Sequence, residues 1–243
     1  MANESSTHVS QCWKDLGDVL DAGVTRVLLY GPPGTGKTFA ALHFGVENAI
    51  AERLVCTEDL TTGEITGTWM PRGEGQWEWR EGPAIRAWHD NDGRGGRLVV
   101  DEVDRASGDA LSTLLAVTDS SESARWRNPE TGTWVSPGAQ FSVVMTTNLE
   151  DLASIPTALR DRFAVAIRID QPHPDAVAML SADLRHAAWA GSLTDASRRL
   201  SLRSFYAFDR LRSRLGSERA ADLVFGTERA EAVLDALRIR ALE

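Results

Sequence analysis

The segment that most constrains this chain is GPPGTGKT, residues 31–38. It follows a continuous apolar run at residues 27–30 and precedes apolar residues with helical spacing that begin at Phe39. Glycine adopts backbone angles that other residues avoid, so three glycines in eight residues allow the chain to curl tightly between two regular elements. The pattern predicts a strand, a tight loop and a helix in immediate succession.

A loop of this kind is suited to holding phosphate. Successive backbone N–H groups can point inward, and the N-terminus of the following helix adds its dipole. Lys37, one of two lysines in the chain, is expected to reach the β- and γ-phosphates, and the Thr38 hydroxyl is expected to coordinate Mg²⁺. The residues expected to contact the nucleoside triphosphate are Gly31, Pro32, Pro33, Gly34, Thr35, Gly36, Lys37, Thr38 and Phe39.

Composition narrows the class of protein. The 243 residues, 42% hydrophobic and 25% charged, suffice for one large or two small globular domains. A net charge of −9 argues against nucleic acid as the main partner. No apolar run approaches the roughly 18 residues of a membrane span, and the first residues are polar without a signal-peptide pattern. We expect a cytoplasmic protein that does not contact membranes, with Cys12 and Cys56 as reduced thiols.

Five apolar runs predict β-strands, at residues 27–30, 54–57, 98–100, 143–147 and 165–169. Near-continuous apolar strands that alternate with helices are typical of a parallel sheet covered on both faces. From residue 172 the spacing is helical and contains no strand candidate. The prediction is therefore an α/β P-loop NTPase core with a five-stranded parallel sheet at residues 1–171, followed by a small all-helical lid domain at 172–243.

Two tryptophan-bearing segments, residues 66–81 and 125–136, read as hairpins inserted into this core. Tryptophan combines a large apolar surface with a polar N–H, so two interpretations stay open. The hairpins either cap the core or sit in a subunit contact, or they bind a substrate directly.

A second motif lies at residues 97–104, RLVVDEVD, where an apolar strand ends in acidic residues. Asp101 can hold Mg²⁺ through its water shell, and Glu102 can orient and deprotonate an attacking water. For Asp104, a role at this site and a role as the N-cap of the following helix both stay open. The strand that ends at MTTN places Asn148 beside the expected γ-phosphate, where it either positions that water or serves as an ordinary turn residue.

Taken together, GPPGTGKT, LVVDEVDRA, MTTN and the segments at residues 158–163 and 201–204 resemble the AAA+ ATPases. The branch they resemble most is the MoxR-like one, of the helix-2-insert type in the dynein-related AAA family. The two hairpins are similar in position to the helix-2 and pre-sensor-1 hairpins of that clade.

The resemblance implies roles for residues beyond the nucleotide motifs. Arg160 and Arg162 match the arginine-finger segment, which acts on ATP bound to the neighbouring subunit, with a slight preference for Arg162, just before Phe163. Asn148 matches sensor 1. Arg203 matches sensor 2, although it also fits a surface arginine of an arginine-rich lid.

The function implied is that of a Mg²⁺-dependent ATPase that forms a homo-oligomeric ring, expected to be a hexamer. It would remodel or activate a client protein, with a von Willebrand-type domain protein as the usual companion in this branch. One alternative is a nucleic-acid-stimulated motor, such as a restriction-type translocase, which the acidic charge disfavours. The other is a small-molecule kinase or P-loop switch, which would act as a monomer and would not need Glu102.

Overall fold

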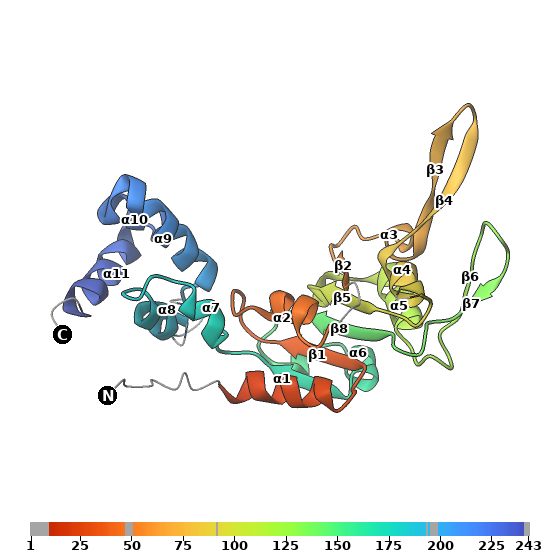
Figure 1. Ribbon diagram of the computed structural model, residues 1–243, viewed down its shortest axis with the longest axis horizontal. Helices are drawn as coiled ribbons and strands as arrows, with labels where there is room; N and C mark the ends of the chain where they lie inside the picture. The colour runs from red at the N-terminus through yellow and green to blue at the C-terminus, as the bar shows by residue number, and fades with distance from the viewer. Residues whose placement is uncertain (1–9, 47–50, 91, 193, 195–198, 241–243) are drawn as a thin grey trace. The chain divides into compact units, whose positions relative to one another are not determined.

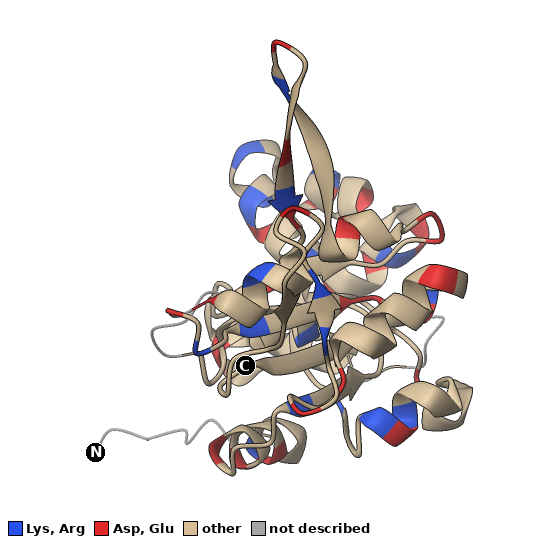
Figure 2. Cartoon of the chain, turned by 90° about the vertical axis from the view of Figure 1, so that its right-hand side faces the viewer, with Lys and Arg blue, Asp and Glu red and all other residues tan. Residues whose placement is uncertain are grey.

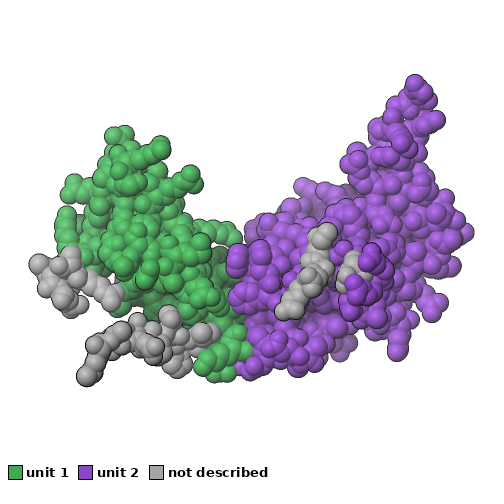
Figure 3. Space-filling view, in the orientation of Figure 1, with its two compact units in different colours: residues 1–14, 32–36, 169–243 green, residues 15–31, 37–168 purple. Residues whose placement is uncertain are grey.

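The computed structural model describes residues 10–46, 51–90, 92–192, 194 and 199–240. The chain forms two compact units, coloured separately in Figure 3. One unit contains residues 15–31 and 37–168, and the other contains the described residues within 1–14, 32–36 and 169–243. The domain boundary expected after residue 171 stays a prediction.

The first unit is built on a parallel sheet of five strands in the order β2-β5-β8-β1-β9 (Figure 1). The strands are β1 (Arg26–Tyr30), β2 (Ala51–Val55), β5 (Arg97–Asp101), β8 (Ser142–Thr146) and β9 (Val165–Arg168). The predicted fold class is confirmed. The largest difference is at β2, which begins three residues before the predicted start. Because β2 lies at the sheet edge, polar residues such as Glu52 and Arg53 fit there and hide the strand from a search for apolar runs.

Helices cover both faces of the sheet, because the connection from β1 to β2 crosses the sheet in the opposite direction to the connection from β2 to β5. Helix α2 (Lys37–His43) contacts β5 and β8, whereas α4 (Pro83–His89) contacts β2 and β5. Alternate residues of β5 face opposite sides, and Leu98 and Val100 pack in one core with Trp88 of α4. The indole N–H of Trp88 donates to the Val117 carbonyl at the end of α5 (Gly108–Val117), at 3.1 Å, so this tryptophan is purely a core residue.

Shorter elements complete the sheet unit. Helix α3 begins after Thr61, whose hydroxyl accepts a hydrogen bond from the Glu64 N–H while the Glu64 carboxylate accepts from the Thr61 N–H, a reciprocal capping box. The division between the units crosses α1 between residues 14 and 15. The elements are α1 (Gln11–Asp21), α3 (Thr62–Thr66), η1 (Val103–Arg105), η2 (Leu152–Ser154) and α6 (Thr157–Arg162).

Both predicted hairpins are present and project from the sheet unit (Figure 1). One consists of β3 (Gly67–Gly73) and β4 (Gln76–Glu81), the other of β6 (Trp126–Arg127) and β7 (Trp134–Val135). Register places Trp69 opposite Trp79, and their rings meet edge to face at 5.6 Å. Trp79 also lies 5.7 Å from Trp126, so the two hairpins touch through indoles. Trp77 and Trp134 are 62% and 69% exposed.

The second unit is helical in its described part beyond residue 172, as predicted. Its helices are α7 (Pro174–Ala178), α8 (Arg185–Ser192), α9 (Leu202–Leu215), α10 (Ser217–Phe225) and α11 (Thr227–Arg240). Phe225 lies 5.4 Å from both Phe205 and Phe208, which joins α9 and α10 around an aromatic core of their own. Among the residues described in both units, no helix is long and apolar enough to cross a membrane.

Candidate nucleotide-binding site

The carboxylate of Asp101, at the C-terminal end of β5, is the centre of a polar cluster. Its Oδ1 accepts hydrogen bonds from the Thr38 hydroxyl at 2.8 Å and from the Thr146 hydroxyl, and its Oδ2 forms an ion pair with Arg53 at 2.5 Å. Burial acts to raise the pKa of Asp101, but the hydrogen bonds from Thr146, Arg53 and Thr38 outweigh it and hold that pKa below its usual value. Asp101 is therefore a buried, ionised carboxylate.

Lys37, at the first position of α2, connects the loop to the end of β8. Its Nζ donates to the Gly31 carbonyl at 2.8 Å and to Asn148 Oδ1 at 3.2 Å. The Gly31 N–H in turn donates to the Leu149 carbonyl at 2.8 Å. The buried ammonium is thus held at the sheet edge by oxygens from two neighbouring chain segments.

Glu102, directly after β5, has a left-handed backbone conformation with φ of 56°. A residue other than glycine in the left-handed conformation costs about 1–2 kcal/mol, and such strain is common at functional sites. Glu102 Oε1 accepts from Asn148 Nδ2 at 3.4 Å, and Oε2 lies 2.7 Å from Arg105 Nε. The turn aims the carboxylate at Asn148, the residue that also accepts from Lys37.

Asp104 does not occupy the N-cap of the helix that follows, because Ser107 holds that position in α5. Its Oδ1 instead accepts a hydrogen bond from the Thr147 hydroxyl at 2.6 Å. Asp104 thereby ties the short helix η1 to the end of β8.

The apex of the loop, residues 32–36, is grouped with the helical unit. Gly34 has φ of 81°, and a Cβ placed there would lie 2.5 Å from the Ser201 Cβ, so glycine alone fits. Ser201 is the N-cap of α9 and accepts from the Ser204 N–H. No pattern in the sequence pointed to the proximity of Ser201 to Gly34.

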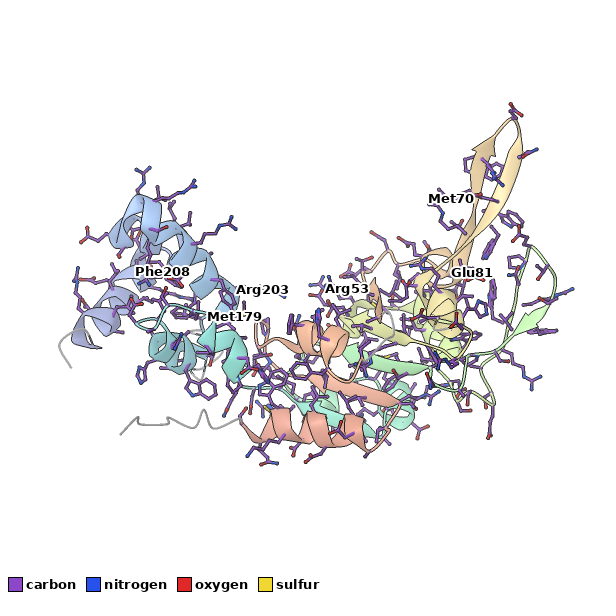
Figure 4. The ribbon with its side chains drawn as sticks, viewed as in Figure 1. Arg53, Met70, Glu81, Met179, Arg203 and Phe208 are labelled. Atoms are coloured by element: carbon purple, nitrogen blue, oxygen red, sulfur yellow. The ribbon has the colours of Figure 1, made fainter. Side chains whose placement is uncertain are left out.

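Two further predicted residues are exposed. Phe39 is 60% exposed and stacks on His43, with ring centroids 4.2 Å apart. Arg203 is the second residue of α9 in the helical unit (Figure 4). Their expected roles at the nucleotide stay predictions.

The two arginines of α6 differ in their surroundings. Arg162 donates to the Leu115 carbonyl in the last turn of α5 at 2.9 Å and pairs with Asp119 at 2.7 Å. It therefore caps the C-terminus of that helix. Arg160 is exposed and contacts the Thr157 hydroxyl, three residues earlier, at 3.3 Å.

The donor set fits Mg²⁺ and a triphosphate. Mg²⁺ prefers hard oxygen ligands and takes few of them from the protein, which suits the hydroxyl of Thr38 and the carboxylate of Asp101. Gly31, Gly34 and Gly36 all have positive φ, the conformation that curls a phosphate-binding loop. Residues present at the site thus match the group that the sequence predicts.

Comparison with known proteins finds a family that matches the segment containing these motifs. The AAA domain family, dynein-related subfamily, matches residues 26–163, which include β1, the loop, β5 and β8. No curated protein matches. A solved structure from Cytophaga hutchinsonii, described as a candidate ATPase, is 22% identical with a TM-score of 0.47 over 67% of this chain and 47% of that one. The chain spans about half the length of that protein.

Cys56 lies beside the cluster and yields the first prediction. Burial, together with the negative charges of Asp104, Asp101 and Glu102, raises the pKa of its thiol to about 12. Because the thiolate is the reactive form, iodoacetamide at pH 8.5 should label the half-buried Cys12 in the native protein and leave Cys56 unlabelled until unfolding.

The same shift predicts a pH effect on stability. The folded state keeps the Cys56 proton that the unfolded chain releases near pH 9, so this group destabilises the fold as pH rises from about 9 toward 12.

Peptide mass spectrometry after timed alkylation measures how fast Cys12 and Cys56 are labelled. Equal labelling rates for the two cysteines in the native protein would contradict the labelling prediction.

Proposed function

The chain belongs to the dynein-related subfamily of AAA domains, and from this membership we propose that it is a ring-forming ATPase that hydrolyses ATP to remodel or activate a partner protein. Within the family we place it in the MoxR-like branch. The proposal extends to Mg²⁺ as cofactor, to a hexameric ring, and to residues 172–243 as a lid domain.

The observation that carries the proposal is the position of the Asn148 side chain. Its Oδ1 accepts from Lys37 and its Nδ2 donates to Glu102, so one amide connects the lysine that follows the loop to the acid that directly follows β5. An amide held between the phosphate-binding lysine and the acid that activates water lies where it can orient that water toward the γ-phosphate. A simple phosphate-binding switch has no need of this link.

We assign the chemistry to residues of this chain as follows. Lys37 would hold the β- and γ-phosphates, and Thr38 and Asp101 would hold Mg²⁺, which neutralises charge on the transferred phosphoryl group. Glu102 would accept a proton from the attacking water, with Asn148 orienting both. Arg105 would have to release Glu102 first, because the guanidinium lies 2.7 Å from Oε2 and occupies the oxygen that a water would need.

For the arginine finger we propose Arg160. A finger acting on the neighbouring subunit needs a free guanidinium, and Arg160 is exposed, whereas Arg162 is engaged with Leu115 and Asp119. Using Arg162 would uncap α5 and break an ion pair. This favours Arg160 over the residue that sequence position alone preferred.

The two interpretations of the hairpins apply to different tryptophans. Trp79 and Trp126 pack against each other, which fits a structural role, while Trp77 and Trp134 are exposed and available to a client. Arg72 and Arg80 both lie 3.8 Å from Glu78, so acidic and basic residues mix along the first hairpin (Figure 2). We propose a client protein rather than nucleic acid; a von Willebrand-type partner is suggested by the resemblance alone.

The proposed activity predicts opposite behaviour for two substitutions. Glu102→Gln should keep ATP binding and lower turnover by about 10²–10⁴-fold, while Lys37→Ala should lose binding. With Mg-ATP, light scattering on a sizing column should show Glu102→Gln growing from 26.5 kDa to a ring, and Lys37→Ala should stay small. Wild-type turnover in Glu102→Gln, or a constant mass of 26.5 kDa, would refute the proposal.

The finger assignment predicts that Arg160→Ala loses about 10³-fold in turnover with unchanged thermal stability. Arg162→Ala should instead lower the free energy of unfolding by about 1–3 kcal/mol, since a helix carbonyl and a carboxylate lose their partner. Mixing Arg160→Ala with Lys37→Ala subunits should restore part of the activity, because each supplies what the other lacks. Wild-type turnover in Arg160→Ala would show that the assignment is wrong.

For the hairpins, Trp77→Ala and Trp134→Ala should leave basal ATP hydrolysis unchanged and abolish its stimulation by an unfolded protein such as casein. Trp79→Ala is the matched control, expected to lower the free energy of unfolding by about 1 kcal/mol through loss of ring contacts. Stimulation that survives both exposed-tryptophan substitutions would mean that the client binds elsewhere.

A further inference from the structure

Arg53 is the cation of the Asp101 cluster, and none of the roles above uses it. It comes from β2, at the edge of the sheet (Figure 4), and its side chain is 47% exposed, whereas the Asp101 side chain is 8% exposed. The ion pair therefore joins a solvent-accessible cation to a buried carboxylate.

The strand register explains how Arg53 reaches this position. Val55 pairs with Asp101, and Arg53 lies two residues earlier, opposite Val99, on the same face of β2 as Val55. The long side chain runs along the strand to its C-terminal end, where Val55 is 43% exposed and leaves the approach open. An arginine at position 53 can therefore contact the end of β5.

The two oxygens of Asp101 have different partners. Oδ1 accepts from the hydroxyls of Thr38 and Thr146, whose positions follow from α2 and β8. Among the described residues, the hydrogen-bond partner of Oδ2 is Arg53. Thr38 and Asp101 are the proposed holders of Mg²⁺, so the guanidinium is the positive charge beside that oxygen pair.

We propose that Arg53 is a positioning residue that compensates Asp101 while no nucleotide is bound and competes with Mg²⁺ for it when Mg-ATP enters. The inference rests on the proposed function, since it requires a Mg²⁺–nucleotide complex at this site. Two cations at one carboxylate repel each other, so Arg53 turns away toward solvent when Mg²⁺ binds.

Exposure of Arg53 keeps this competition modest. A half-exposed ion pair contributes little, so the guanidinium tunes the affinity for Mg²⁺ rather than blocking it. Asp101, by contrast, is buried, and without any cation it would be left uncompensated. Arg53 thus stabilises the site without Mg²⁺ and lowers the affinity of the site for Mg²⁺.

These opposite effects give the test its signature. Arg53→Gln removes the charge at similar length, and Arg53→Lys keeps the charge. Arg86→Gln is a matched control, because Arg86 is 46% exposed and pairs at 2.6 Å with Glu52, also on β2, without touching Asp101. Titration calorimetry measures binding of the non-hydrolysable ATP analogue AMP-PNP, once in EDTA and once at graded Mg²⁺ concentrations.

In Arg53→Gln we expect the Mg²⁺ concentration for half-maximal tightening to fall by about fivefold, the range open to a partly exposed ion pair. Its melting temperature in EDTA should fall by roughly 2 °C and recover with Mg-AMP-PNP. Arg53→Lys should stay near wild type, and Arg86→Gln should lose stability in both conditions with an unchanged Mg²⁺ dependence. Attraction between Arg53 and the nucleotide phosphates contributes both in EDTA and in Mg²⁺. Comparing the two conditions therefore cancels this contribution.

An unchanged or increased Mg²⁺ requirement in Arg53→Gln, with nucleotide binding intact in the wild type, would overturn this inference and leave the proposed ATPase standing. Tighter binding in EDTA as well as in Mg²⁺ would also overturn it, because the effect would not involve the cation. A wild-type protein that binds no nucleotide in either condition would overturn both proposals together.

Discussion

The hydrogen-bonded carboxylate of Asp101 joins the ends of neighbouring strands to the helix that follows the loop. Thr38 comes from α2, Thr146 from β8 and Arg53 from β2, and these elements meet because β2, β5 and β8 are adjacent in the sheet. Behind them the central residues of β5 and β8 are apolar and buried, so polar groups at the strand ends must satisfy one another. The hydrogen bonds and the ion pair of Asp101 therefore stabilise the C-terminal ends of these strands and also hold the carboxylate where it can bind a cation.

Much of this site could be predicted because its members follow strands directly. The carboxyl ends of parallel strands gather at one edge, so Asp101, Glu102 and Asn148 were expected near Lys37 once the strands were located. Arg53 had no such signal, since it lies inside an edge strand whose polar start concealed it. The capping role of Arg162 was equally hidden, because it depends on a carbonyl of α5 that is distant in sequence. Local spacing finds residues at element ends; contacts across the fold depend on register and packing.

In the hairpins, too, the sequence predicted the elements but not the contacts between them. Tryptophans on either side of glycine-containing turns predicted two hairpins, and pairing of Trp69 with Trp79 follows from the register of β3 and β4. Which indole is covered was decided by the second hairpin, which places Trp126 against Trp79. Trp77 lies on the same strand as Trp79 and has the same chemistry, yet it is 62% exposed. Tertiary contact, not residue type, separates the structural tryptophans from those open to a partner.

The acidic cluster next to β5 explains why arginines surround it. Asp101, Glu102 and Asp104 lie within four residues of sequence, and their combined negative field contributes to the raised pKa of the neighbouring Cys56 thiol. Arg53 compensates the first acid and Arg105 the second, while Asp104 accepts from a neutral hydroxyl. Each acid proposed to take part in catalysis thus has a guanidinium partner, and both guanidinium groups are about half exposed, at 47% and 55%. Partners of this kind can leave toward water at small cost, so the site can be electrostatically balanced when empty and still yield to a cation and a reacting phosphate.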